Sequence, residues 1–207
     1  MGDSERLHSF RHMLTDHSLA HAIVEEIRIA AHDSRWAAQF VAERERLLDL
    51  LPGHFAAIEH IGSTAVPRLA AKPIIDILGG VNTISEADAL LEPLCAHGYE
   101  TSAGFNATLP DKRWLMRHAF GRRTHHLHLV VFGGEQWVQR LQFRDVLRAD
   151  PAIAARYEHL KQELAEQHRH DREAYTHAKA AFINEVLTNV SYSSQPTPLR
   201  VAAAGGR

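Results

Sequence analysis

The sequence has little cysteine, no long apolar run and no excess of charge of one sign. Cys95 is its single cysteine, so the chain cannot form a disulfide within itself. No run of about 18 apolar residues and no signal-peptide pattern is present, so we expect no membrane association and a cytoplasmic location. The 23 Lys and Arg residues nearly balance the 25 Asp and Glu residues, and a formal net charge of -2 argues against tight nonspecific binding to nucleic acid.

The composition that is present fits one globular domain with extensions. The chain has 207 residues, of which 45% are hydrophobic, and this is enough for a single core. We predict an N-terminal extension over residues 1–26, a domain over residues 27–190, and a disordered tail, rich in Ser, Pro, Ala and Gly, over residues 191–207.

The order of the periodic segments predicts an α+β fold. Apolar residues spaced by three and four indicate a helix from Arg35 to Leu51, and three more helices after residue 134. The segment Ser85-Glu-Ala-Asp88 has the pattern of a capping box that opens another helix. Strands are expected at residues 54–61, 73–80, 112–120 and 124–132, the last two joined by Gly121-Arg122-Arg123. We therefore expect a mixed β-sheet with flanking helices and a C-terminal helical bundle.

A phosphate-sized turn and a carboxylate lie on two consecutive predicted strands. Gly62 lacks the Cβ that would keep a ligand from the backbone, and Ser63 and Thr64 add hydroxyl groups. Asp76 falls within the next strand, where a buried charge is costly unless a partner or a cation offsets it. Together they suggest phosphoryl or nucleotidyl transfer with a divalent metal. The alternative is an ordinary turn, with Asp76 satisfied by backbone N–H groups.

Two histidines share one face of the strand predicted at residues 124–132. Strand alternation places His126 and His128 on one side and the intervening leucines on the other. With Asp76 they could form a His-His-carboxylate metal site, or one imidazole could act as a general base. The alternative is a polar outer face of the sheet.

Nearby cations could offset phosphate charge. Lys72 precedes the strand that carries Asp76, and Arg123 precedes the histidine strand, within a small basic group that includes Arg122 and His125. Several polar residues of the C-terminal helices could also reach the sheet, although helix surfaces usually carry such residues; they are Arg144, Asp145, Tyr157, Lys161, Asp171, Tyr175 and Lys179.

The segment from Glu59 to Leu78, EHIGSTAVPRLAAKPIIDIL, resembles the GrpB family, also called UPF0157. The resemblance extends to Asp33-Ser-Arg-Trp36, to Arg123-Thr-His-His-Leu-His128, to Phe143-Arg-Asp-x-Leu147 and to Asp171-Arg-Glu-Ala-Tyr175. It covers about residues 27–187, and several motifs in the same order make it specific.

This resemblance implies a nucleotidyltransferase-like fold. In that superfamily a Gly-Ser turn binds a triphosphate and an Asp-x-Asp strand holds two Mg²⁺ ions. Gly62 and Ser63 would then be the phosphate turn and Asp76 the first metal carboxylate, but the second carboxylate position is occupied by Leu78. Arg68 also departs from the glycine expected in the family. GrpB-like domains occur fused to dephospho-CoA kinase, where they are regarded as a folding accessory.

The leading hypothesis is a nucleotidyltransferase-fold protein that binds a nucleotide or phosphorylated small molecule with Mg²⁺ or Mn²⁺, and that transfers a nucleotidyl group to an acceptor the sequence does not identify. Its candidate catalytic and metal residues are Asp76, His126 and His128. Its candidate phosphate-binding residues are Gly62, Ser63, Thr64, Lys72 and Arg123. Two alternatives remain: a non-catalytic accessory module, and a site at Asp76 and the two histidines that binds a transition metal such as Zn²⁺ for other chemistry.

Overall fold

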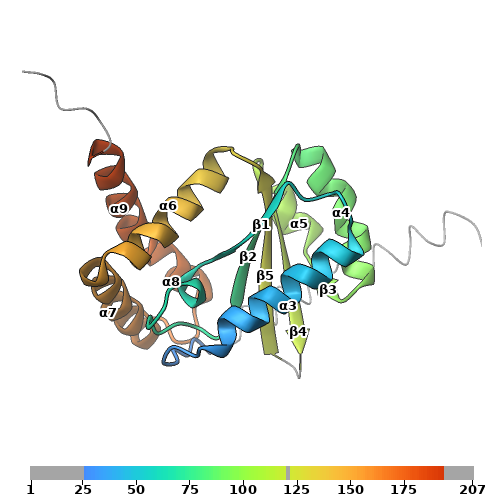
Figure 1. Cartoon of the computed structure of the whole chain (residues 1–207). Coiled ribbons are helices and arrows are strands. Elements are labelled where there is room, and N and C mark those ends of the chain that lie inside the picture. Colours follow the sequence, from blue (N-terminus) through green and yellow to red (C-terminus); the bar gives the residue numbers. More distant parts are fainter. Residues whose placement is uncertain (1–25, 120–121, 194–207) are drawn as a thin grey trace, which may run out of the picture.

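A five-stranded mixed sheet in the order β1-β2-β5-β4-β3 organises the protein (Figure 1). The structure, a computed structural model, describes residues 26–119 and 122–193. β2 and β5 run parallel, and the other neighbouring strands are antiparallel. The strands are β1 (Ala57–Ile61), β2 (Ile75–Val81), β3 (Tyr99–Glu100), β4 (Lys112–Ala119) and β5 (Arg122–Val131). The sheet and its helices confirm the predicted α+β class.

Helices cover the sheet in two groups. In Figure 1, α6, α7, α8 and α9 gather at the left of the sheet, whereas α4 lies at its right and α3 crosses in front. The helices are α3 (Arg35–Leu50), α4 (Ile84–Ala96), α5 (Ala103–Ala107), α6 (Glu135–Ala149), α7 (Pro151–Gln167), α8 (Arg172–Ala178) and α9 (Ala180–Ser193). In the part of the chain that the structure describes, no helix combines the length and apolar character needed to cross a membrane.

The alternation of β2 separates a core from a polar site. Ile75 and Ile77 are buried in the main core with residues of α3, α4 and β5. Leu78 packs on the other face, in a smaller cluster that includes Trp137 of α6, and Asp76 shares that face because its side chain is two residues away. Cys95 of α4 is a buried core residue.

Helix ends follow local chemistry, with three differences from the sequence expectations. The N-cap of α4 is Thr83, whose hydroxyl accepts a hydrogen bond from Glu86 N, so the capping box predicted at Ser85 is wrong. Arg122 and Arg123 belong to β5 rather than to a turn. The last predicted helix is two helices separated at Lys179, which keeps helical torsions (φ -73°, ψ -20°), so the apolar periodicity does not reveal the break.

The predicted terminal extensions lie almost entirely outside the described residues. α9 includes residues 191–193, the first three residues of the predicted tail. Residues 194–207 and 1–25 lie outside the part that the structure describes.

A buried carboxylate ties α3 to the sheet edge. Glu43 is 4% exposed and accepts a hydrogen bond from the Tyr99 hydroxyl at 2.7 Å. It also pairs with Arg46 at 2.6 Å and with Arg117 of β4. Burial acts to raise the pKa of Glu43, but the hydrogen bonds from Arg46 and Tyr99 outweigh it, and the net pKa lies below the ordinary 4.5.

We expect Glu43→Gln to lower the free energy of unfolding by about 3 kcal/mol at neutral pH, because it removes the charge that two arginines and Tyr99 share. A lowered carboxyl pKa stabilises the fold above the unfolded-state pKa, and this stabilisation is lost as the pH falls through the folded-state pKa. The difference in the free energy of unfolding between Glu43→Gln and the wild type should therefore shrink below about pH 4.5. Urea unfolding followed by circular dichroism at pH 7 and pH 3 measures it.

The matched control is Asp88→Asn, which breaks the pair between Asp88 and Arg113 near the surface, where Asp88 is 49% exposed. It should cost less than about 1 kcal/mol. Equal losses in the two variants would contradict the importance of the Glu43 cluster.

Candidate functional site

A cavity of about 420 Å³ lies beside the polar face of β2 and β5, on the side of the C-terminal helices. Its wall includes the turn at Gly62, Ser63 and Thr64 and the side chains of Asp76, His126 and His128. The structure thus brings together the predicted turn, carboxylate and histidines. Lys72 also lines the cavity.

Asp76, His126 and His128 form a compact cluster on two parallel strands. Asp76 lies opposite His126 in the register of β2 and β5. Asp76 Oδ1 is 3.0 Å from His126 Nδ1 and 3.8 Å from His128 Nε2. One ligand atom from each of the three residues lies within 4.8 Å of the others, which is the single such cluster found among the described residues.

The surroundings keep the carboxylate charged and the imidazoles neutral. Burial acts to raise the pKa of Asp76, but hydrogen bonds and charge from His126 and His128 outweigh it and hold the net pKa well below its usual range. Burial lowers the pKa of His126, although the hydrogen bond to Asp76 opposes this. Burial and the charge of Arg140 lower the pKa of His128 to about 3. Near neutral pH the cluster therefore offers one anion and two neutral imidazoles, the protonation states that a metal ligand needs.

The donor set and spacing fit a divalent metal ion. Ligand atoms about 2.0–2.1 Å from a tetrahedral metal lie roughly 3.3 Å apart, between the 3.0 Å and 3.8 Å separations of this cluster. His126 Nε2 and His128 Nδ1 are buried and have no hydrogen-bond partner in the described part of the chain. These are the ring nitrogens that do not face Asp76, so they are not the atoms that would hold a metal together with it. Buried polar atoms usually have a partner, and an ordered water would supply one to each of these nitrogens.

Glycine is required beside Asp76. Gly62 has φ 70°, and a Cβ built on it would lie 2.4 Å from Asp76 Oδ2. The missing side chain therefore lets the turn approach the carboxylate, a role different from the ligand approach expected from the sequence. Ser63 interacts with the buried Tyr157, whose pKa is raised by burial despite an opposing hydrogen bond with Ser63.

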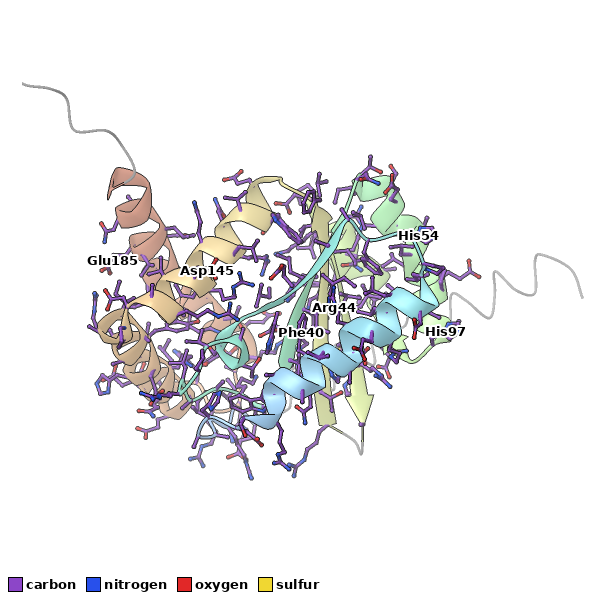
Figure 2. The ribbon with its side chains drawn as sticks, viewed as in Figure 1. Phe40, Arg44, His54, His97, Asp145 and Glu185 are labelled. Carbon is purple, nitrogen blue, oxygen red and sulfur yellow. The ribbon has the colours of Figure 1, made fainter. Side chains whose placement is uncertain are left out.

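The hydroxyl of Thr64 is occupied by the protein itself. It donates to the Ile74 carbonyl at 3.2 Å, and His60 Nε2 lies 3.1 Å from the same oxygen. The His60 ring stacks on Phe40 of α3, with centroids 4.7 Å apart, and Figure 2 shows Phe40 on the side of α3 that faces the sheet. Thr64 thus fixes the turn to the segment before β2, and its hydroxyl is not directed at a ligand as the sequence suggests.

The cavity wall carries much more positive than negative charge. Its cationic residues are Lys72, Arg140, Lys161, Arg172 and Lys179, and Asp76 is its one carboxylate. Four of the five cations come from α6, α7 and the α8 region, and sequence patterns alone give no reason to select Arg140 or Arg172. The sequence did offer one indication of this wall, the spacing of four residues between Tyr175 and Lys179. In the structure the Lys179 ammonium lies 4.2 Å from the Tyr175 ring centroid.

One predicted cation, Arg123, and one further arginine, Arg68, lie outside the cavity lining. Arg123 is 3% exposed and does not line the cavity, although its charge acts on His126. β5 has one extra residue relative to β4 between Arg123 and His125, so simple strand alternation does not assign Arg123 to a face. Arg68 is exposed and is also outside the cavity lining. Its φ of 67° is the one positive value at a non-glycine residue in the described part, which explains why glycine suits this position.

Comparison with solved structures gives the same fold. A structure described as "Crystal structure of conserved protein GrpB from Enterococcus faecalis" superposes with a TM-score of 0.71 and is 36% identical. The match covers 80% of this chain and 98% of that chain. The fold is therefore similar over nearly the whole of that solved protein.

Sequence comparisons agree. The UPF0157 protein YqkA of Bacillus subtilis is 37% identical over 164 residues, 79% of this chain, but the match spans only 47% of that protein's length. A dephospho-CoA kinase of Mycolicibacterium paratuberculosis is 32% identical over 210 residues, 88% of this chain and 49% of that protein. The family model described as "GrpB protein" matches residues 26–189. The chain belongs to the GrpB family.

Proposed function

We propose that this protein binds a nucleotide or another phosphorylated small molecule in the cavity, together with one divalent metal ion held by Asp76, His126 and His128. The observation that carries this proposal is the convergence of five cationic side chains and the three-residue cluster on one cavity wall. Five cationic side chains and one carboxylate line the cavity among the described residues, and an excess of positive charge suits an anionic ligand. A volume of about 420 Å³ lies in the range of small-molecule sites.

The donor set favours a metal that accepts imidazole. Two ring nitrogens and one carboxylate suit Zn²⁺, Mn²⁺ or Fe²⁺ better than Mg²⁺, which prefers oxygen ligands. A bound metal would neutralise and polarise a phosphate oxygen. Arg140 adds positive charge beside the proposed metal site, because its charge acts on His128. Its Nε is buried and has no hydrogen-bond partner among the described residues, so it could donate to a bound phosphate.

Nucleotidyl transfer is the reaction we propose if the site is catalytic, with Asp76 beside the Gly62-Ser63 turn as its support. The second carboxylate of a two-metal site is replaced by Leu78, which is fully buried beside Trp137. This favours one metal over two.

A non-catalytic accessory module is the alternative function. Leu78 supports it, and so does the similarity to part of a dephospho-CoA kinase, since such a module would bind its ligand without transfer. Turnover of a bound nucleotide separates the two.

A thermal-shift screen of nucleoside mono-, di- and triphosphates, with and without Mg²⁺, Mn²⁺ and Zn²⁺, tests the proposed site. A ligand at 100 times its dissociation constant adds about 2.7 kcal/mol of stability, which raises the melting temperature measurably. We expect a metal-dependent shift in the wild type and its loss in Asp76→Asn, because that variant removes the anionic metal ligand.

The control is Asp49→Asn, which changes an exposed carboxylate of α3 outside the cavity and should keep the full shift. A shift that survives in Asp76→Asn would show that the metal cluster is assigned wrongly. The absence of a shift with every nucleotide would contradict the proposed function.

Anion affinity should fall as the pH rises from 7 to 9. Burial lowers the pKa of Lys161 to about 7 and of Lys179 to about 8, so both lose positive charge across this range. The charged groups that act on them are Glu158 and Lys179, which act on Lys161, and Asp76 and Arg172, which act on Lys179. Of these only Lys179 titrates between pH 7 and 9, and it is one of the two lysines whose charge is lost. We expect about a tenfold loss of pyrophosphate affinity, measured by isothermal titration calorimetry.

Lys179→Arg serves as the comparison, because arginine keeps its charge throughout this range and should make the loss smaller. An affinity that is constant or that rises with pH would contradict a role for these lysines in anion binding.

A further inference from the structure

Lysine is scarce in this chain and concentrated at the cavity. Of the 23 Lys and Arg residues, only Lys72, Lys112, Lys161 and Lys179 are lysines. Three of these four line the cavity, and Lys112 does not. Because the chain uses arginine almost everywhere else, the three lysines form a distinct group, here named the lysine cluster.

The lysine cluster surrounds two buried tyrosine rings. The Lys72 ammonium lies 5.9 Å from the Tyr175 ring centroid, and the Lys179 ammonium lies 4.2 Å from it. The Lys161 ammonium lies 5.1 Å from the Tyr157 ring centroid. These lysines come from the segment before β2, from α7 and from the end of α8. Aromatic faces attract the ammonium groups without neutralising them, so positive charge remains available to a ligand.

Two members of the lysine cluster, Lys161 and Lys179, form no ion pair with a carboxylate in the described part of the chain. Lys161 donates a hydrogen bond to the Ala70 carbonyl, while the nearby Glu158 carboxylate accepts from Ala70 N at 2.6 Å. Within the described ranges, neither Lys161 nor Lys179 has a carboxylate oxygen within 4.0 Å. The negative charge of Asp76 partly opposes the lowering of the Lys179 pKa by burial, but the Asp76 carboxylate itself is hydrogen-bonded to His126.

The lysine cluster and the Asp76 cluster line one cavity, and no ion pair joins Asp76 to Lys161 or Lys179 within the described ranges, although the charge of Asp76 acts on Lys179. The Asp76 end offers ligand atoms for a metal, with Arg140 nearby. The lysine end offers compact ammonium charges, which bind oxyanions as point charges without the planar geometry that arginine imposes. One anionic group at the metal end would leave Lys161 and Lys179 without a carboxylate partner in the described part of the chain, at a cost in desolvated charge.

We propose that the lysine cluster is a second anion subsite, so that the ligand of this cavity carries two anionic groups, one at the Asp76 metal cluster and one at Lys72, Lys161 and Lys179. This proposal rests on the proposed function for the first group. The second group is an oxyanion, either a further phosphate or a carboxylate.

Isothermal titration calorimetry with Mn²⁺ and three probes tests the second subsite: orthophosphate, with one anionic group, and pyrophosphate and phosphoglycolate, each with two. We expect at least one of the two larger probes to bind at least tenfold more tightly than orthophosphate. Lys179→Gln should remove most of this preference. Preference for pyrophosphate identifies a second phosphate, and preference for phosphoglycolate identifies a carboxylate.

Lys112→Gln is the matched control, since it changes the one lysine outside the cavity and should keep the preference. Lys179 is chosen over Lys161 because the Lys161 ammonium donates a hydrogen bond to the Ala70 carbonyl, so replacing Lys161 could also disturb folding. Melting temperatures of all variants check folding.

Equal affinity for all three probes in the wild type would overturn the second subsite while leaving the proposed metal and phosphate site in place. A preference that Lys179→Gln leaves unchanged would also overturn it. Failure of every probe to bind with Mn²⁺ would instead remove the proposed function on which the subsite rests.

Discussion

The parallel pairing of β2 with β5 is the constraint on which the site depends. It sets Asp76 opposite His126, while Ile75 and Ile77 of β2 and Leu127 of β5 enter the core on the other face. Because side chains alternate along a strand, a slip of one residue would turn Asp76 into that core and the isoleucines toward the cavity. The apolar alternation that builds the core therefore also holds the polar cluster in place.

The surrounding elements fix the turn and supply the charge. His60, Thr64 and Ile74 connect β1, the turn and the segment before β2, so Gly62 stays against Asp76. The C-terminal helices then close the cavity with cationic side chains whose burial lowers their pKa values. Desolvated charges of one sign destabilise a fold, and such arrangements occur where a ligand uses them. The buried cationic side chains that lower the stability of the fold are thus the same side chains that could bind an anion.

Leu78 gives the site a chemistry unlike that of a two-carboxylate metal strand. It is fully buried between the sheet and α6, in a cluster with Ile61, Val130 and Trp137. The histidines of β5 supply nitrogen donors at the neighbouring position. The strand position at Leu78 instead strengthens the contact between the sheet and the C-terminal helices. The metal binding that we propose therefore uses one carboxylate and two imidazoles.

Much of this arrangement could be predicted from local sequence. The Gly-Ser-Thr turn, the apolar strand around Asp76 and the alternation of His126 and His128 are local patterns, and the structure contains all three. Local patterns also predicted the α+β class and the first C-terminal helices. They misplaced the cap of α4 and missed the break at Lys179, where one hydroxyl or a small change of hydrogen bonding decides the boundary.

By itself, the sequence determined which side chains share a face of a strand or helix, because that depends only on the two-residue and 3.6-residue periods of the backbone. It could not determine which faces meet. Only the tertiary structure decided that Arg123 lies outside the cavity lining and that Arg140, Lys161, Arg172 and Lys179 belong to it. Those positions depend on how four helices, distant in sequence from the turn, pack against β2 and β5, and that packing is set by side-chain contacts across the whole domain.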